Sequence, residues 1–446
     1  MNLSVALVRG KWHSVWESLA CGYLKSFTSD LVEPGDYVFY DGYFDSDEEI
    51  IKGCAEADIV GFSGTTSQMP WSLRIATQIK QRNANTRIYI GGYGPSVAPE
   101  KFTESVDGVV VGEGERPWRD ILASDGSERG VIFRSPIDNL DSIPFPDRDF
   151  IKVERCINVA KTEEGRRVTG ILGNRGCLRK CRFCADGLPK SIYGVKLRER
   201  SPKNIVDEMI QVYNAWDLNF LKFADAEFNT RPGRTKEMCA EMIARGSIVP
   251  WGANFLANPW EDGEGELLYR AGCREAWIGL ESGSLAIHRT IGKGVTPKLI
   301  EHSLKDAKEG GLVRRCYVLL GMPDETAETI RETEDLIDRS EPDFVSFSIL
   351  APYPGTDFYR PEFADWDWGK IDEYGGDANQ FHNLGITKMN REQLLTERVR
   401  LMEKYAGKLP AIMKKKRELG WISGQSPNKV ISTDEIQLTD YPDGCE

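Results

Sequence analysis

The chain has 446 residues, a formal charge of −12 and a pI of about 5.2. This length favours two or three domains over a single core. The acidic balance argues against partners such as nucleic acid or an anionic membrane surface, because both require basic surface. No stretch approaches about 18 consecutive apolar residues, and the first residues resemble a strand and not a signal peptide. We therefore expect a cytoplasmic protein that binds neither nucleic acid nor membrane.

Residues 1 to 125 alternate short apolar runs with amphipathic stretches. Strands are expected at 3–8, 37–40, 59–63, 88–92 and 109–111, and helices at 15–27, 48–57 and 71–82. Short and almost wholly apolar strands are typical of a parallel sheet that is covered on both faces. This part of the chain is therefore predicted to be a doubly wound, Rossmann-like α/β domain.

Polar or glycine-rich loops follow four of these strands, at the edge where doubly wound sheets bind ligands. Glycine lets the backbone approach a bulky ligand closely, and hydroxyl groups can bond amides or phosphate. A single loop of this kind is more often a mere connection, but four on one edge predict a ligand site. The candidate residues are Trp12 after the first strand; Ser63, Gly64, Thr65, Thr66, Ser67, Gln68 and Met69 after the third; Gly91, Gly92, Tyr93 and Gly94 after the fourth; and Gly112, Glu113, Gly114 and Glu115 after the fifth.

The remainder of the chain contains a second series of alternating strands and helices. Residues 126 to 165 are expected to be a linker, because each proline in 141–147 biases its predecessor away from helix. From 166 to 355, strands at 169–173, 220–224, 252–256, 275–280, 314–320 and 344–350 alternate with helices at 202–216, 235–245, 264–271, 297–309 and 326–339. These six units predict a partial (β/α)6 barrel of the TIM type, with its site at the carboxyl ends of the strands. Residues 356–446, including a helical run at 391–416, are expected to form a mainly helical segment that caps the barrel mouth.

Three of the ten cysteines, Cys177, Cys181 and Cys184, lie in one loop directly after the first strand of this second series. A buried helical stripe of cysteines is opposed by the glycines and arginines of the loop. A structural zinc site would normally need a fourth Cys or His nearby, and residues 157–238 contain no other. Three closely spaced thiolates instead predict metal ligands for three irons of a 4Fe–4S cluster, with the fourth iron open to a ligand that is not protein.

The cysteine loop resembles the CX3CX2C signature of the radical S-adenosylmethionine (SAM) superfamily, with Phe183 at the usual aromatic position. Segment 280–283 resembles the family's fourth-strand segment, whose acidic residue contacts SAM. Segment 320–326 resembles the one beside the adenine, and 223–228 the acidic second-strand segment. The resemblance implies SAM contacts from Phe183, Asp225, Glu227, Glu281, Ser282, Gly321, Met322 and Pro323. Simpler roles are a cap or an ion-pair partner for Glu281, and solvated loop acids for Asp225 and Glu227.

Residues 1–125 resemble the cobalamin-binding domain that precedes the barrel in the cobalamin-dependent branch of this family, so the four loops above imply a cobalamin site. Many cobalamin proteins supply a His to the cobalt, but no His occurs between residues 58 and 114, and His13 is the only conceivable local ligand. We expect that no His binds the cobalt, and that Gln68, Met69, Tyr93 or nothing faces its lower side. A domain that has lost cobalamin altogether is the alternative.

The resemblance also implies an activity. In this family the cluster and SAM generate a 5′-deoxyadenosyl radical that removes hydrogen from an unactivated carbon, and in the methylating members methylcobalamin supplies a methyl group. We therefore expect a C-methyltransferase that acts on a protein or peptide, for example on a glutamine of methyl-coenzyme M reductase, or on a small molecule. Its electrons are expected to come from a flavodoxin or ferredoxin. A cyclase or ring-rearranging enzyme is the alternative, and a non-catalytic cobalamin or redox-sensing module is a third hypothesis.

Overall fold

The computed structural model describes residues 3–12, 15–185, 192, 197–246, 249–363, 386–406 and 414. His13 of the sequence predictions therefore lies outside the described residues, as does most of the segment after 363. The chain divides into two compact units. The first contains the described residues up to Cys156 together with 353–363, and the second contains the remaining described residues from Ile157 onward, apart from 192.

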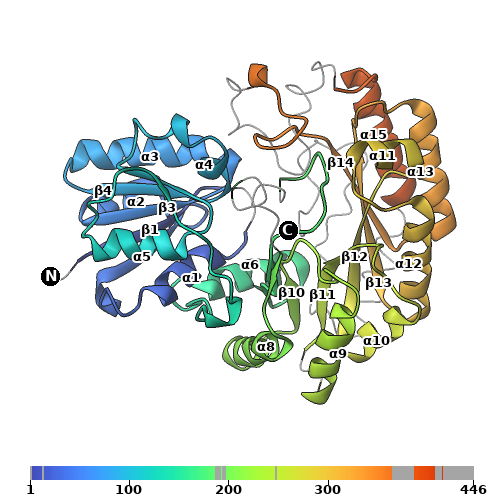
Figure 1. Cartoon of the computed structure of the whole chain (residues 1–446), viewed down its shortest axis with the longest axis horizontal. Helices are drawn as coiled ribbons and strands as arrows, with labels where there is room; N and C mark the ends of the chain where they lie inside the picture. The colour runs from blue at the N-terminus through green and yellow to red at the C-terminus, as the bar shows by residue number, and fades with distance from the viewer. Residues whose placement is uncertain are drawn as a thin grey trace. The chain divides into compact units, whose positions relative to one another are not determined.

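A six-stranded parallel sheet forms the centre of the first unit (Figure 1). Its strands are β1 (Val5–Arg9), β2 (Tyr37–Asp41), β3 (Ile59–Ser63), β4 (Arg87–Gly91), β5 (Gly108–Val111) and β6 (Gly130–Phe133), in the order β2-β1-β3-β4-β5-β6. The chain adds β2 on one side of β1 and β3 on the other, so the topological switch point lies between β1 and β3. The predicted doubly wound sheet is confirmed, and such sheets bind ligands at this switch point.

Helices cover both faces of this sheet (Figure 1). The helices are α1 (Leu19–Phe27), α2 (Asp47–Ala55), α3 (Met69–Arg82), α4 (Tyr93–Val97) and α5 (Glu115–Ala123), with short 3-10 turns η1 (Pro34–Asp36), η2 (Thr66–Gln68), η3 (Pro99–Lys101) and η4 (Leu140–Ser142). Helices α2 and α3 pack against each other on one face, and α1 contacts α5 on the other. Ile50 of α2 and Ile75 of α3 are fully buried against strand residues such as Ile88 and Ile90. Burial on both faces explains why the strands are almost wholly apolar.

The first unit extends beyond residue 125, where the sequence analysis placed its end. Strand β6 pairs with β5 in the stretch expected to be a linker, and only Ile132 of its four residues is buried. The proline-rich stretch after it packs on α1, where the Asp147 amide donates to the Gly22 carbonyl over 3.1 Å. Helix α6 (Val153–Glu164) then leads into the second unit.

The second unit is built on a second six-stranded parallel sheet (Figure 1). Its strands are β7 (Val168–Ile171), β10 (Phe220–Phe223), β11 (Trp251–Phe255), β12 (Cys273–Glu281), β13 (Val313–Leu320) and β14 (Phe344–Ile349). They lie side by side in chain order, and among the described strands β7 and β14 are the two edges, which confirms a partial barrel. Its helices are α8 (Pro202–Trp216), α9 (Arg234–Ala244), α10 (Glu264–Arg270), α11 (Leu285–Ile291), α12 (Pro297–Glu309), α13 (Ala327–Ser340) and α15 (Arg391–Ala406).

Two further described segments lie outside the two six-stranded sheets. The short antiparallel strands β8 (Asn174–Arg175) and β9 (Arg198–Glu199) flank the cysteine loop. The segment after β14 includes the 3-10 turn η6 (Pro361–Phe363). Its residues 353–363 belong to the first unit, where the Tyr93 hydroxyl donates to the Pro354 carbonyl over 3.4 Å.

Within the part of the chain that the structure describes, no helix has the length and apolar character needed to cross a membrane.

Candidate active site

The three cysteines of the CX3CX2C loop differ from the other described cysteines in exposure. Cys177, Cys181 and Cys184 are partly exposed, whereas the other six described cysteines are buried. Burial raises the pKa of Cys239 and of Cys316 to about 12, so these thiols stay protonated and behave as small apolar groups. The loop follows β7, at the carboxyl edge where a barrel holds its reactive groups.

The donor set fits an iron–sulfur cluster. No three Cys, His, Asp or Glu side chains among the described residues converge closely enough to hold a single metal ion, as a tetrahedral zinc site would require. A 4Fe–4S cluster takes one thiolate per iron, so its cysteines need not converge on one point. Three accessible thiols in one loop match this demand.

The cysteine loop packs on the end of α11 and on the turn that follows it. The Arg182 amide donates to the Ile291 carbonyl over 2.9 Å, and the Arg182 guanidinium donates to the Thr290 carbonyl over 3.3 Å. A Cβ at Gly292 would lie 3.2 Å from the Lys180 carbonyl oxygen. The next residue in this turn, Lys293, was not among the sequence predictions.

Glu281 and Lys293 form a buried ion pair at the end of β12. The Lys293 ammonium lies 2.6 Å from Glu281 Oε1 and donates to the Gly279 carbonyl over 2.8 Å. Burial disfavours the charge of Lys293, but the Glu281 carboxylate, together with Cys181 and Cys184, outweighs burial and raises the pKa of the lysine. Glu281 has a φ of 58°, a conformation that costs a non-glycine residue about 1–3 kcal/mol and is retained only where its surroundings hold it. The carboxylate predicted to contact SAM therefore has a fixed position.

Ser282 is committed to the fold. Its hydroxyl lies 3.2 Å from the Thr333 hydroxyl, and the Gly283 amide donates to the same threonine over 2.9 Å. The Ser282 carbonyl accepts from His288 Nε2 over 2.7 Å. These contacts fasten the end of β12 to α11 and α13, and thereby hold the strained backbone of Glu281.

The second-strand acids, Asp225 and Glu227, are both buried. Asp225 accepts hydrogen bonds from the backbone amides of Gly173 and Asn174, at 2.7 and 3.0 Å. The Glu227 carboxylate accepts from the Cys177 thiol. The structure thus brings both acids to the cysteine loop, and neither is a solvated loop acid.

The predicted adenine segment is also held by a buried acid. The Glu325 carboxylate accepts from the Gly321 amide, and burial raises the pKa of Glu325 to about 7. Gly321 has a φ of 84°, Met322 is fully buried, and Pro323 is partly exposed. Phe183 in the cysteine loop is partly exposed. The backbone of this segment and these two partly exposed rings remain the candidate SAM contacts.

In the first unit, the loop after β3 carries two buried hydroxyl groups with no hydrogen-bond partner, those of Thr66 and Ser67. A buried hydroxyl without a partner costs about 1–3 kcal/mol, so such groups usually have a ligand or a water. They lie beside the topological switch point of the sheet. This pair is the feature of the first unit that best fits a polar cofactor.

The glycines of the neighbouring loop bring backbone against backbone. Gly92, after β4, has a φ of 104°, and a Cβ there would lie 2.5 Å from the Gly64 carbonyl oxygen. A Cβ at Gly94 would lie 3.0 Å from the Thr66 amide nitrogen. Larger residues would push the loops after β3 and β4 apart.

Of the three side chains considered for the lower face of cobalt, two are buried in the domain. Gln68 accepts from the Thr65 amide over 2.7 Å and donates to the Gly10 carbonyl over 3.2 Å, so its amide is already used. Met69 is only 3 % exposed. Tyr93 remains partly exposed, with its hydroxyl directed to Pro354.

The other predicted loop residues lie at the same edge of the sheet. Ser63 ends β3, and Gly91 ends β4. Trp12, Glu113 and Gly114 are partly exposed, whereas Glu115 is buried in the first turn of α5. The Gly112 amide donates to the Ser96 hydroxyl over 2.9 Å. The four loops expected to share an edge therefore do so.

Comparisons with known protein families agree with this division. Residues 171–337 match the model of the radical SAM superfamily, and residues 2–122 match that of the B12 binding domain. The chain belongs to the cobalamin-dependent radical SAM enzymes. Its cofactors are therefore a 4Fe–4S cluster, SAM and cobalamin, and the cysteine loop and the two buried hydroxyls fit this assignment.

Three relatives of this cobalamin-dependent radical SAM enzyme are similar over most of their length. An uncharacterized methyltransferase of Pyrococcus horikoshii is 27 % identical over 70 % of this chain and 70 % of its own. The anaerobic magnesium-protoporphyrin IX monomethyl ester cyclase of Rubrivivax gelatinosus is 25 % identical over 80 % of this chain and 67 % of its own. The bacteriochlorophyllide d C-12(1)-methyltransferase of Chlorobaculum tepidum is 26 % identical over 82 % of this chain and 78 % of its own.

A solved structure shares the fold of the enzyme. The radical SAM methyltransferase TsrM from Kitasatospora setae, with cobalamin and a 4Fe–4S cluster bound, superposes with a TM-score of 0.65. The identity is 20 %, over 80 % of this chain and 77 % of TsrM. The likeness confirms the two-domain α/β fold expected from the sequence.

Proposed function

We propose that this enzyme transfers a methyl group from cobalamin to an unactivated carbon of its substrate. The observation that carries the proposal is the pairing, in one chain, of an accessible three-cysteine loop after the first barrel strand with the buried hydroxyls of Thr66 and Ser67 at the switch point of the first sheet. Two of the relatives and the TsrM protein are named as methyltransferases, which supports the proposal.

The described residues divide the work between two sites. When bound, the cluster and SAM supply the radical that removes a hydrogen atom, and cobalamin supplies the methyl group. Cys177, Cys181 and Cys184 would hold the cluster, and Glu281 would orient the amino group of SAM. Thr66 and Ser67 would bond polar groups of cobalamin. An external flavodoxin or ferredoxin would supply electrons.

The test uses enzyme reconstituted under anaerobic conditions with iron, sulfide and hydroxocobalamin. It is incubated with SAM carrying a deuterated methyl group, reduced flavodoxin and one candidate acceptor. Mass spectrometry should show 5′-deoxyadenosine, S-adenosylhomocysteine and an acceptor heavier by one deuterated methyl group in place of hydrogen. The absence of all three with every acceptor tried, despite an intact cluster, would contradict the proposal.

The acceptor that we propose to test first is a peptide containing the target glutamine of methyl-coenzyme M reductase, which the sequence resemblance suggested. A chlorin is the second acceptor, because one relative is named for methylating a bacteriochlorophyllide. Labelling of only one of the two would identify the substrate class.

A cyclase is the second candidate function, because a relative that covers 80 % of the chain is named as a cyclase. A cyclase would produce 5′-deoxyadenosine without S-adenosylhomocysteine and without labelling the acceptor. The same incubation therefore separates the two functions.

A further inference from the structure

The start of the cysteine loop is held by the side chain of Asp225. One carboxylate oxygen, Oδ1, accepts from two successive backbone amides, those of Gly173 and Asn174, at 2.7 and 3.0 Å. The other oxygen lies 2.8 Å from the position that a Cβ would take at Gly173, so the loop must begin with glycine to approach this closely. Asp225 is 3 % exposed. Its side chain is therefore enclosed by the loop and does not face an open site.

The residues around Asp225 fix it in turn. The Asn254 side chain, from the neighbouring strand β11, donates to the Asp225 carbonyl over 3.1 Å. The Asn174 side chain donates to the Glu227 carbonyl over 2.9 Å. The contacts run in both directions between the end of β10 and the start of the loop, so the two segments cannot slide past each other without breaking several buried bonds.

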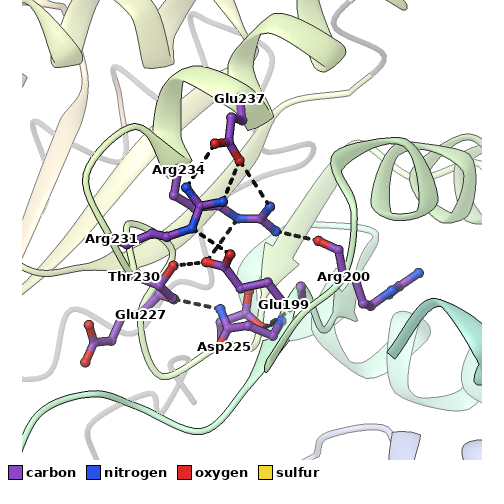
Figure 2. A network of polar contacts seen from close by, with 10 residues as sticks. Glu199, Arg200, Asp225, Glu227, Thr230, Arg231, Arg234 and Glu237 are labelled. Carbon is purple, nitrogen blue, oxygen red and sulfur yellow. Dashed lines mark hydrogen bonds and ion pairs between the residues drawn. The ribbon is translucent and has the colours of Figure 1, made fainter. Parts of the chain in front are cut away.

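The other end of the loop is held by a separate ion network (Figure 2). The Glu199 carboxylate lies 2.9 Å from Arg231 Nε and 3.6 Å from Arg234 Nε. Arg234, which is 3 % exposed, also donates to the Arg200 carbonyl over 2.8 Å. Strand β9 carries Glu199 and pairs with β8, which begins at Asn174. Figure 2 shows Asp225 beneath this network, so both ends of the loop are fastened to the segment after β10.

We infer that Asp225 is a positioning residue that sets the place of the cysteine loop against strand β10, and not a direct contact of SAM. The inference assumes, as part of the proposed function, that the loop carries the cluster. By accepting hydrogen bonds from the amides of Gly173 and Asn174, Asp225 fixes the backbone from which Cys177 would bind iron. Its effect on SAM passes through the cluster.

Two variants separate this role from a direct contact. D225A removes the acceptor of two buried amides, whereas D225N keeps an oxygen in the place of Oδ1. D207A is the matched control, because Asp207 lies on α8 and its partners are the exposed side chains of Lys203, at 2.6 Å, and Arg245, at 3.0 Å. Each variant is prepared as the full chain, without cofactors and after anaerobic reconstitution.

Hydrogen exchange, cluster spectra and SAM affinity are the three measurements. In D225A we expect the amides of residues 173 and 174 to exchange roughly tenfold faster or more, because both lose their buried hydrogen-bond acceptor. We also expect a lower iron content and an altered paramagnetic resonance spectrum of the reduced cluster. D225N should restore the iron content, the spectrum and the slow exchange, and D207A should match the wild type in all three measurements.

A specific result would overturn the inference. If D225A kept wild-type exchange, iron content and spectrum and lost only SAM affinity, Asp225 would be a direct SAM contact. If D225A failed to fold, D225N would provide the test. A loss of SAM affinity in D225N with an intact cluster spectrum would also overturn the positioning role. Hydrogen exchange is measured on the cofactor-free chain. A failure of methyl transfer in the wild type would therefore contradict the proposed function without affecting the exchange test of Asp225.

Discussion

Breaking the buried ion pair between Lys293 and Glu281 should destabilise the barrel unit strongly. The two side chains are 8 % and 11 % exposed, and the charged atoms are 2.6 Å apart. The substitution K293M replaces the ammonium group with an apolar methionine side chain and leaves the Glu281 carboxylate buried without its charged partner. Removal of one partner from a buried pair costs about 3–5 kcal/mol. For a unit of this size, each kcal/mol lowers the melting temperature by about 2–4 °C, so we expect a fall of about 10 °C.

The assay is differential scanning calorimetry of the cofactor-free chain, with two further variants. The double variant E281Q/K293M removes the unpaired charge and should recover most of the lost stability. The control K308M breaks the exposed pair between Lys308 and Glu341, which are 54 % and 63 % exposed, and should shift the melting temperature by no more than about 2 °C. Equal melting temperatures for K293M and the double variant would refute the reasoning, because the two charges would then not be coupled.

Three further predictions concern single positions. T66V should weaken cobalamin binding about tenfold, as measured by equilibrium dialysis, without destabilising the cofactor-free chain. The control S72A removes a hydroxyl that donates to the Gln68 carbonyl over 3.0 Å, and it should leave the cobalamin Kd unchanged in the same assay. G92A should lower the melting temperature more than G130A, because both residues have positive φ but only Gly92 faces the backbone of another loop. Burial raises the pKa of Asp225 from 3.8 to about 7, so the wild type should lose stability as the pH rises from about 4 through about 7. D225N lacks this titration, so calorimetry across that range should show its stability rising relative to the wild type by up to about 4 kcal/mol.

The sequence was most informative where one local pattern decides the outcome. The expected strand at 59–63 and the expected helix at 297–309 agree with β3 and α12 at both ends. Strands buried on both faces must be apolar throughout, and Thr296 followed by Pro297 is a strong helix start. The spacing of Cys177, Cys181 and Cys184 predicts cluster ligands in the same local way, because ligands close together in the chain need no tertiary contact to be recognised.

Strand β6 was missed because its own residues give little signal. It is an edge strand, with Val131 and Phe133 exposed at 53 % and 43 %, so burial does not mark it as part of a sheet. Its pairing with β5 is a contact between segments that only the folded chain brings together.

By itself, the sequence determined the two α/β units, the cysteine loop and the edge of the first sheet that carries the polar loops. Periodicity and spacing record which faces are buried and which ligands are neighbours along the chain. Only the tertiary structure decided which buried charges meet. Lys293 reaches Glu281 because α11 turns back toward β12, and Asp225 reaches the loop before Cys177 because β7 and β10 are adjacent. Buried charges need partners, and the fold alone determines which partners lie within reach.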